Sequence, residues 1–203
     1  MPESKVLLDE NLAKVFGWYM GDGYLNILDN FKCFGMCYSL DELEIREELN
    51  RILGSYGLSV KEHHFSEDKK MKADRIYNAS WGRMINQYFG HTSHAKRIPK
   101  EILCSPLSVQ VAFIAYWFAA DGTVGKDKKL IRVKLESVNF DVLQDLKCML
   151  ANIGIMSSLR THNTTCNGKK FKSNTLEIRQ AWIKDFKEII GIPGFKGKLT
   201  GIS

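Results

Sequence analysis

Two aspartates occupy matching places in the chain, and their side chains could bind a metal ion. Asp22 lies in the stretch GWYMGDG and Asp121 in the stretch YWFAADG. A carboxylate at the C-terminal end of a helix opposes the helix dipole at a cost of about 0.3–1 kcal/mol, so stability gives no reason to repeat it. Two adjacent carboxylates favour a shared divalent cation, and their hard oxygen atoms suit Mg²⁺. Such a pair, placed on the dyad of a duplex-binding surface, could hydrolyse one phosphodiester in each strand.

The elements that must position these aspartates are two apolar helices. Leu12, Val15, Phe16, Tyr19 and Met20 follow helical spacing before Asp22, and the apolar run 111–120 leads into Asp121. Gly17 and Gly21 would let a second helix approach closely, and that helix offers small residues at Ala112, Ala115 and Ala119. If the two helices pack side by side about a pseudo-dyad, their terminal carboxylates converge.

The surroundings of the two aspartates also repeat. Each aspartate is followed by a short polar strand pair and then by a segment of helical spacing, over residues 41–56 and 139–153. Gly57 and Gly154 follow these segments as left-handed helix stops. The order helix, two strands, helix, two strands, helix is written twice. We therefore expect an α+β monomer of two pseudo-symmetric αββαββα halves, residues 1–99 and 100–203, joined around residues 91–107.

Charge is distributed unevenly along the chain, whose net charge is +6. Residues 1–100 hold 14 basic and 14 acidic side chains, whereas the rest hold 15 and 9. Ile131, Val133 and Leu135 alternate with charged residues, so one face of this strand is core and the other is charged. Contact with water alone would explain such charged faces, but an excess of basic side chains also favours binding to a polyanion. The candidate DNA-binding residues are Lys32, Lys61, Arg75, Arg132, Lys134, Arg160 and Arg179.

Other polar residues carry weaker signals. Ser39 and Ser137 each lie between a strand and a helix, where they could be polar groups near the metal, but the N-cap of the helix is the simpler role. Ser39 also has the capping-box spacing with Glu42. His91 and His94 resemble a metal pair only superficially and are interpreted as loop residues.

Composition excludes several protein classes. With 44% hydrophobic and 26% charged residues, the chain is typical of a folded globular protein. Its longest apolar run, residues 111–120, is too short for the roughly 20 residues of a membrane span. The five cysteines include no C-x-x-C pair, which favours reduced thiols. No targeting segment is visible, so an intracellular location is expected, in an organism and compartment that the sequence leaves open.

The two motifs and the repeated αββαββα order resemble the LAGLIDADG homing endonucleases, in the monomeric form that carries both motifs in one chain. The sequence departs from that family's pattern at Met20 and Ala119, where the family often has an earlier acid. It departs also at Tyr116, where the family prefers a small residue in the helix interface.

The resemblance implies that the motif helices form the domain interface and that the two antiparallel sheets form a DNA-binding saddle. It implies that Asp22 and Asp121, with Gly21 and Ala120, hold two or three divalent ions shared between the halves. It also implies a basic residue after the fourth strand of each half. Lys96 and Lys198 are the preferred candidates, with Arg97 and Lys196 as alternatives.

The function expected from this resemblance is Mg²⁺-dependent, site-specific double-strand cleavage of DNA at a long asymmetric target. The enzyme would cut across the minor groove, leave 3′ overhangs and read the target from the major groove. Two alternatives stay open: an intron-encoded RNA maturase on the same fold, and a catalytically inactive DNA-binding regulator. Two like charges facing DNA would serve no purpose in a pure binder, which favours the enzyme. The expected partner is double-stranded DNA, with intron RNA as the partner under the maturase alternative, and no membrane is expected.

Overall fold

The computed structural model describes residues 6–26, 33–64, 71–127, 130–166 and 168–193. The first half comprises α1 (Glu10–Asp22), β1 (Gly23–Asn26), β2 (Cys33–Ser39), the 3₁₀ turn η1 (Leu40–Glu42), α2 (Leu43–Ser55), β3 (Val60–His64), β4 (Met71–Tyr77) and α3 (Ala79–Phe89). A short helix, α4 (Lys100–Leu103), lies between the halves. The second half comprises α5 (Leu107–Asp121), β5 (Thr123–Asp127), β6 (Leu130–Ser137), α6 (Phe140–Asn152), β7 (Ser157–Cys166), β8 (Lys169–Ile178), η2 (Gln180–Trp182) and α7 (Ile183–Ile190).

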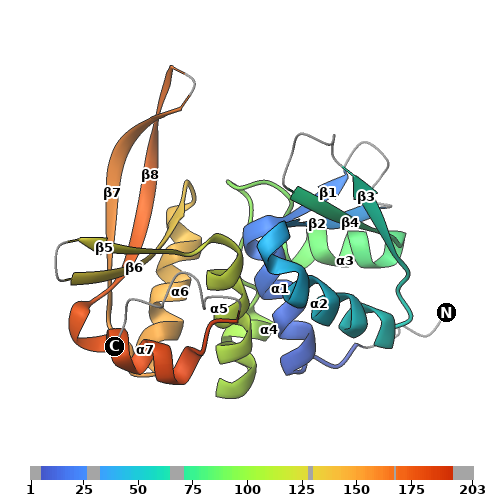
Figure 1. Cartoon of the computed structure of the whole chain (residues 1–203), viewed down its shortest axis with the longest axis horizontal. Helices are drawn as coiled ribbons and strands as arrows, with labels where there is room; N and C mark the ends of the chain where they lie inside the picture. The colour runs from blue at the N-terminus through green and yellow to red at the C-terminus, as the bar shows by residue number, and fades with distance from the viewer. Residues whose placement is uncertain (1–5, 27–32, 65–70, 128–129, 167, 194–203) are drawn as a thin grey trace.

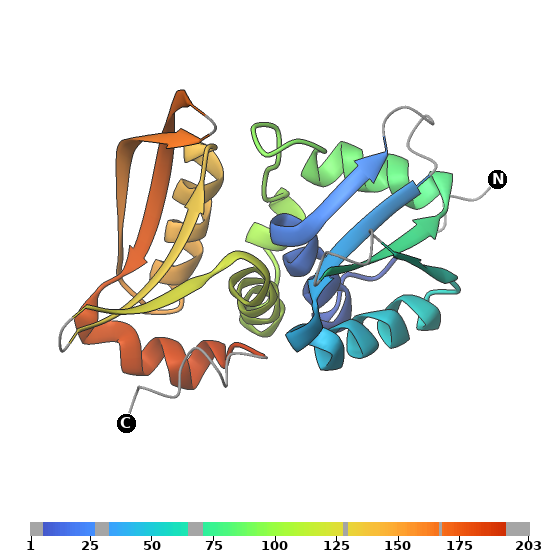
Figure 2. The same ribbon diagram turned by 45° about the horizontal axis from the view of Figure 1, so that its top comes forward.

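Each half contains one four-stranded antiparallel sheet. The strand orders are β1-β2-β4-β3 and β5-β6-β8-β7, so the topology of the first half is repeated in the second. Figures 1 and 2 show the two sheets on either side of the paired helices α1 and α5, with other helices covering one face of each sheet. The predicted α+β fold of two αββαββα halves with the motif helices at their interface is confirmed.

The α1–α5 contact depends on glycine. A Cβ atom added to Gly17 would lie 2.2 Å from the main-chain oxygen of Phe113, a separation that no real Cβ atom tolerates. At the ends of the helices, a Cβ atom on Gly21 would lie 2.6 Å from the Cβ atom of Ala120. The glycines of α1 therefore let the two backbones approach, as predicted. Their nearest atoms on α5 belong to Phe113, Trp117, Ala120 and Asp121, and not to the predicted Ala112, Ala115 and Ala119.

Tyr116 does not disturb this packing, although the family prefers a small residue there. Its side chain is buried and donates a hydrogen bond from the phenol to Glu48 of α2. Lys14 donates to the same carboxylate at 2.8 Å, and its ammonium lies 5.7 Å from the centre of the Tyr116 ring. The large residue thus connects the second half to α2 of the first half instead of separating the motif helices.

Local sequence signals explain where the helices start and stop. Gly57 and Gly154 follow α2 and α6 with φ values of 73° and 89°, as expected for left-handed stops. Ser39 and Glu42 form the predicted capping box, in which the Ser39 N–H donates to the Glu42 carboxylate at 2.7 Å. The N-cap expected of Ser137 is wrong, because Asn139 caps α6 with its side-chain oxygen.

No helix in the described part of the chain is long and apolar enough to span a membrane.

Candidate functional site

The two motif aspartates are the last residues of adjacent helices. Asp22 ends α1 and Asp121 ends α5, and each is followed by the first strand of its half. A Cβ atom placed on Gly21 would lie 3.0 Å from the Cβ atom of Asp121, so the end of one motif touches the end of the other. The structure therefore brings the candidate metal ligands of both halves to one point on the pseudo-dyad.

Lys96 lies at this same point and binds the end of α1. Its ammonium donates to the main-chain oxygens of Tyr19, Met20 and Gly23 at 2.7, 2.9 and 3.0 Å. Tyr19 and Met20 belong to the last turn of α1 and Gly23 is its C-cap, so the ammonium lies at the helix end where a positive charge is favourable. Burial lowers the pKa of Lys96 to about 8, against the opposing influence of Asp121 and Asp22, which favour the charged form.

The alternative basic residue of the first half points elsewhere. The guanidinium of Arg97 donates to the main-chain oxygen of Gln87 in α3. Geometry therefore selects Lys96 over Arg97 as the basic neighbour of the aspartates. The candidates of the second half, Lys196 and Lys198, lie outside the described residues, and so does Lys32.

A hollow of about 400 Å³ opens beside Asp121. It is lined by Gly21, Lys96 and Asp121, and on the side of the second sheet by Glu136, Ser137 and Ser173. The sequence pattern placed Glu136 on a charged strand face but did not assign it to the site. Only the register of β6 shows that this strand ends next to the motif helices.

Cys37 takes the place of Glu136 in the first half. Gly35 pairs with Tyr24 and Lys134 pairs with Thr123, and each of these partners lies two residues after its motif aspartate. Cys37 and Glu136, two residues further along their strands, are therefore equivalent. Burial, followed by the neighbouring charge of Asp22, raises the pKa of the Cys37 thiol, while Lys96 lowers it. The two halves therefore flank one pair of aspartates with different side chains, a carboxylate and a thiol.

The donor set at this point fits a hard divalent cation. The two motif aspartates supply carboxylates from both halves. Within the described residues, no three His, Cys, Asp or Glu side chains cluster as a metal site. Gly21 and Ala120 can add only main-chain oxygens, and the Gly21 oxygen lies 3.5 Å from the ammonium of Lys96. Mg²⁺ is commonly held by one or two carboxylates together with water and substrate phosphate, and this arrangement suits such binding.

The first sheet presents basic side chains on the face opposite its covering helices, here called its front face. Lys61 and Arg75 are paired in register across β3 and β4. Arg75 donates to the phenol oxygen of Tyr24 at 3.3 Å across Gly35, and Lys61 lies 5.7 Å from the centre of the Tyr77 ring. The two predicted DNA-binding residues therefore form one basic and aromatic surface.

The second sheet presents a mixed front face. Arg132, Lys134 and Arg160 lie on the side opposite the buried residues Val133 and Leu176, as predicted. Arg179 follows β8 directly and is exposed. Acidic side chains lie between these basic ones: Lys134 forms an ion pair with Glu136 at 3.0 Å, and Arg132 forms one with Glu177 at 3.5 Å.

The two histidines of the connecting segment lie in the loop between α3 and α4, as expected. The Nδ1 atom of His91 is 2.7 Å from the side-chain oxygen of Asn86, so the ring is positioned by the end of α3. Asn139 donates to the main-chain oxygens of His94 and Lys96 at 2.9 and 2.8 Å, which ties the loop to the start of α6.

Comparison with known proteins supports the resemblance seen in the motifs. Residues 108–191 match the model of a LAGLIDADG-like domain. A DNA polymerase of Thermococcus hydrothermalis is 30% identical over 188 residues, which cover 89% of this chain but 11% of the polymerase. The chain spans about a tenth of the length of the polymerases it matches.

Solved structures share the complete fold. The homing endonuclease I-DmoI, solved with DNA and Mn, has a TM-score of 0.65 at 16% identity, over 91% of this chain and 97% of that one. The homing endonuclease I-WcaI, bound to its DNA recognition sequence, has a TM-score of 0.63 at 17% identity, over 98% of this chain and 94% of that one.

Proposed function

Since this chain carries a LAGLIDADG-like domain within the fold of the single-chain, two-domain LAGLIDADG homing endonucleases, we propose that it is a site-specific, metal-dependent double-strand DNA endonuclease. The observation that carries this proposal is the meeting of Asp22 and Asp121 at the ends of two adjacent helices. The charge of each carboxylate opposes the dipole of its helix, so the dipole gives no reason for an acid at either position. A role in holding a divalent cation, which in turn would contact the DNA phosphate, accounts for both.

The chain's own residues would divide the reaction as follows. Asp22 and Asp121, with the main-chain oxygens of Gly21 and Ala120, would hold divalent cations, for which we propose Mg²⁺. Bound there, the cations would lower the pKa of an attacking water and neutralise charge on the phosphate. Lys96 fixes the last turn of α1 and thereby the direction of Asp22, and its ammonium adds positive charge beside the scissile phosphates.

The front faces of the two sheets would bind the duplex on either side of the aspartates. Lys61 and Arg75 on the first sheet have unlike counterparts on the second, because the corresponding positions are Ser158 and Glu177. Two different surfaces favour two different half-sites. We therefore propose an asymmetric target bound by a single copy of the chain.

The test is to replace each aspartate by asparagine. Asp22→Asn or Asp121→Asn keeps the shape of the side chain but removes a charged ligand, so cleavage of a duplex selected by the wild type should fall at least about a hundredfold, equal to about 2.7 kcal/mol of barrier. Binding of the same duplex in Ca²⁺ should be retained or tightened, because a negative charge facing phosphate is removed. The exposed Asp185 of α7 supplies the matched control, Asp185→Asn, which should cut normally.

Two results would contradict the assignment. Undiminished double-strand cutting by either variant would show that the aspartates do not hold the cations. Loss of cutting together with a lowered melting temperature would show that they support the fold instead. Binding of intron RNA in place of duplex DNA by the wild type would favour the maturase.

A further inference from the structure

The front face of the second sheet contains a hollow of about 290 Å³, away from the aspartates, where several charged side chains meet. Arg132, Arg160, Arg179 and Glu177 all line it. The sequence predicts each of these arginines separately as a DNA-binding residue. The tertiary structure adds that they surround one carboxylate.

Strand register places Glu177 in the middle of this group. It pairs with Lys134 on β6 and with Ser158 on β7, so it has a neighbour on each side. Arg132 lies two residues before Lys134, and Arg160 lies two residues after Ser158, so both are diagonal neighbours of Glu177 on the same face. The Arg132 guanidinium is 3.5 Å from the Glu177 carboxylate, which is about one-fifth exposed.

A carboxylate on a surface that receives DNA is repelled by phosphate, and it weakens binding to every sequence alike. It gains a favourable contact only where the duplex presents a hydrogen-bond donor. In the major groove those donors are the amino groups of cytosine and adenine. Adenine also presents its N7 acceptor beside the amino group, which repels a carboxylate, whereas the cytosine edge presents the donor alone.

The arginines suit the other base of the same pair. Guanine presents two acceptors, O6 and N7, and a guanidinium contacts both at once. A carboxylate flanked by arginines therefore matches the two edges of a C·G pair side by side. Arg132 is already directed toward Glu177, while Arg160 and Arg179 are exposed on the rim of the hollow.

We propose that Glu177 is a specificity-determining residue that accepts a hydrogen bond from the amino group of a cytosine, with a neighbouring arginine on its guanine partner, in the half-site bound by the second sheet. The assignment rests on the proposed function, since it requires duplex DNA on this face. It adds an acidic residue to a surface where the sequence predicted only basic DNA-binding side chains.

The experiment is selection from a randomised duplex library, in Ca²⁺, by the wild type and by Glu177→Gln and Glu177→Ala. The wild type should require cytosine at one position of the second half-site. Glu177→Gln should shift that preference to adenine, because an amide contacts adenine N6 and N7 together, with a change of roughly tenfold or more in relative affinity. Glu177→Ala should lose the preference at that position and keep the others.

The matched control is Glu188→Gln in α7, which removes the same charge from a side chain that is 62% exposed and paired with Lys184 at 3.8 Å. It should leave the selected sequence unchanged. If Glu177→Gln binds all sequences more tightly by one factor with the same base profile, Glu177 only offsets Arg132 and the assignment is overturned. If the wild type selects no duplex, the proposed function and this assignment are both overturned. If the wild type binds and cleaves DNA but the Glu177 variants select the same base profile as the wild type, the assignment alone is overturned.

Discussion

On its helix-covered face, the first sheet has a buried carboxylate at a position where the second sheet has a leucine. Asp74 is fully buried and pairs in register with Met36 and Glu62. The equivalent row of the second sheet is Leu135, Leu176 and Leu159, and Leu176 is equally buried. One topology therefore accepts two kinds of contact between its sheet and the helix that covers it.

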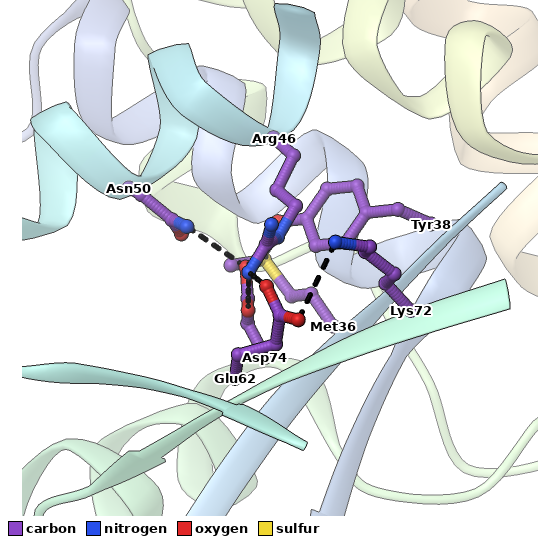
Figure 3. Close-up of polar contacts among 7 residues, drawn as sticks. All are labelled: Met36, Tyr38, Arg46, Asn50, Glu62, Lys72 and Asp74. Atoms are coloured by element: carbon purple, nitrogen blue, oxygen red, sulfur yellow. Dashed lines mark hydrogen bonds and ion pairs between the residues drawn. The ribbon is translucent and has the colours of Figure 1, made fainter. Parts of the chain in front are cut away.

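The charged version is a network centred on Asp74 (Figure 3). Arg46 of α2 donates to both carboxylate oxygens of Asp74 at 2.9 and 2.7 Å, and the amide of Asn50 donates to one of them at 2.8 Å. Arg46 also contacts Glu62 at 2.5 Å. In the second half, 97 residues after Arg46, the covering helix α6 has the buried residue Leu143.

This difference shows that the fold does not require the ion pair. Removing two charges from water costs several kcal/mol, which their attraction repays only with good hydrogen bonds. The leucines of the second half cover the same position without that cost. We infer that the first half is the more sensitive to loss of a single partner.

The motif helices differ between the halves in a second way. Gly17 and Tyr116 are equivalent, because both precede their motif aspartate by five residues. Gly17 brings the backbones together at Phe113, while Tyr116 sends its side chain to Glu48. At this pair of equivalent positions, the interface therefore has a close backbone contact in the first half and a lateral hydrogen bond in the second.

The largest expected effect tests the charged network. Arg46→Leu should destabilise the protein by about 3–5 kcal/mol, because it leaves the buried carboxylate of Asp74 without its charged partner. Asp74→Leu should cost less, because Arg46 keeps its ion pair with Glu62. Arg46→Leu combined with Asp74→Leu copies the second half and should recover most of that loss. Urea unfolding of the four proteins, analysed as a double-mutant cycle, measures the coupling. A double variant that loses the sum of the two single effects would show that the halves are not interchangeable at this position.

A smaller effect is expected at the close contact. Gly17→Ala should cost about 1–3 kcal/mol, because the new methyl group would meet the Phe113 oxygen and separate the helices that carry the aspartates. Cleavage should fall with stability. Gly54→Ala in α2 is the control, since nothing lies within 4 Å of its Cβ position and alanine favours a helix, so that variant should be slightly more stable. Thermal unfolding that ranks the two variants equally would remove the special role of Gly17.

The smallest effect concerns two equivalent acids, Glu48 on α2 and Asp145 on α6. Burial opposes the charged form of Glu48, but hydrogen bonds from Lys14 and Tyr116 outweigh it and lower the pKa. Burial and then the charge of Asp141 raise the pKa of Asp145. Glu48 therefore contributes stability above its unfolded pKa, near 4.5, and loses it as pH falls. Asp145 contributes stability below its unfolded pKa, near 3.8, and loses it as pH rises through the raised folded value.

Two substitutions should therefore act with opposite signs. Glu48→Gln should lower stability at neutral pH and flatten the loss of stability in acid. Asp145→Asn should raise stability at neutral pH and steepen that loss. Each change should stay below about 1 kcal/mol, because both groups are partly solvated. Melting temperatures between pH 3 and pH 7 measure the effects, and parallel curves for the two variants would contradict the pKa directions.

Local patterns in the sequence were sufficient to predict the repeat and the paired aspartates. Helical spacing, the stops at Gly57 and Gly154 and the strand alternation at Ile131–Leu135 are all encoded by neighbours within a few residues. The glycines of the first motif likewise predict a close helix contact without knowledge of the rest of the chain. These features survive in the structure because each is satisfied by the backbone or by one packed face.

Tertiary structure alone decided which polar groups meet. No pattern distinguishes Lys96 from Arg97, since their environments depend on how the connecting segment crosses the end of α1. The same holds for Asp74, whose burial requires a helix residue 28 positions away, and for Glu136 and Glu177, whose neighbours are set by strand register. The free energy of a buried or surface-paired charge depends on distant partners that surround it from several elements, whereas hydrophobic periodicity is a property of one element by itself.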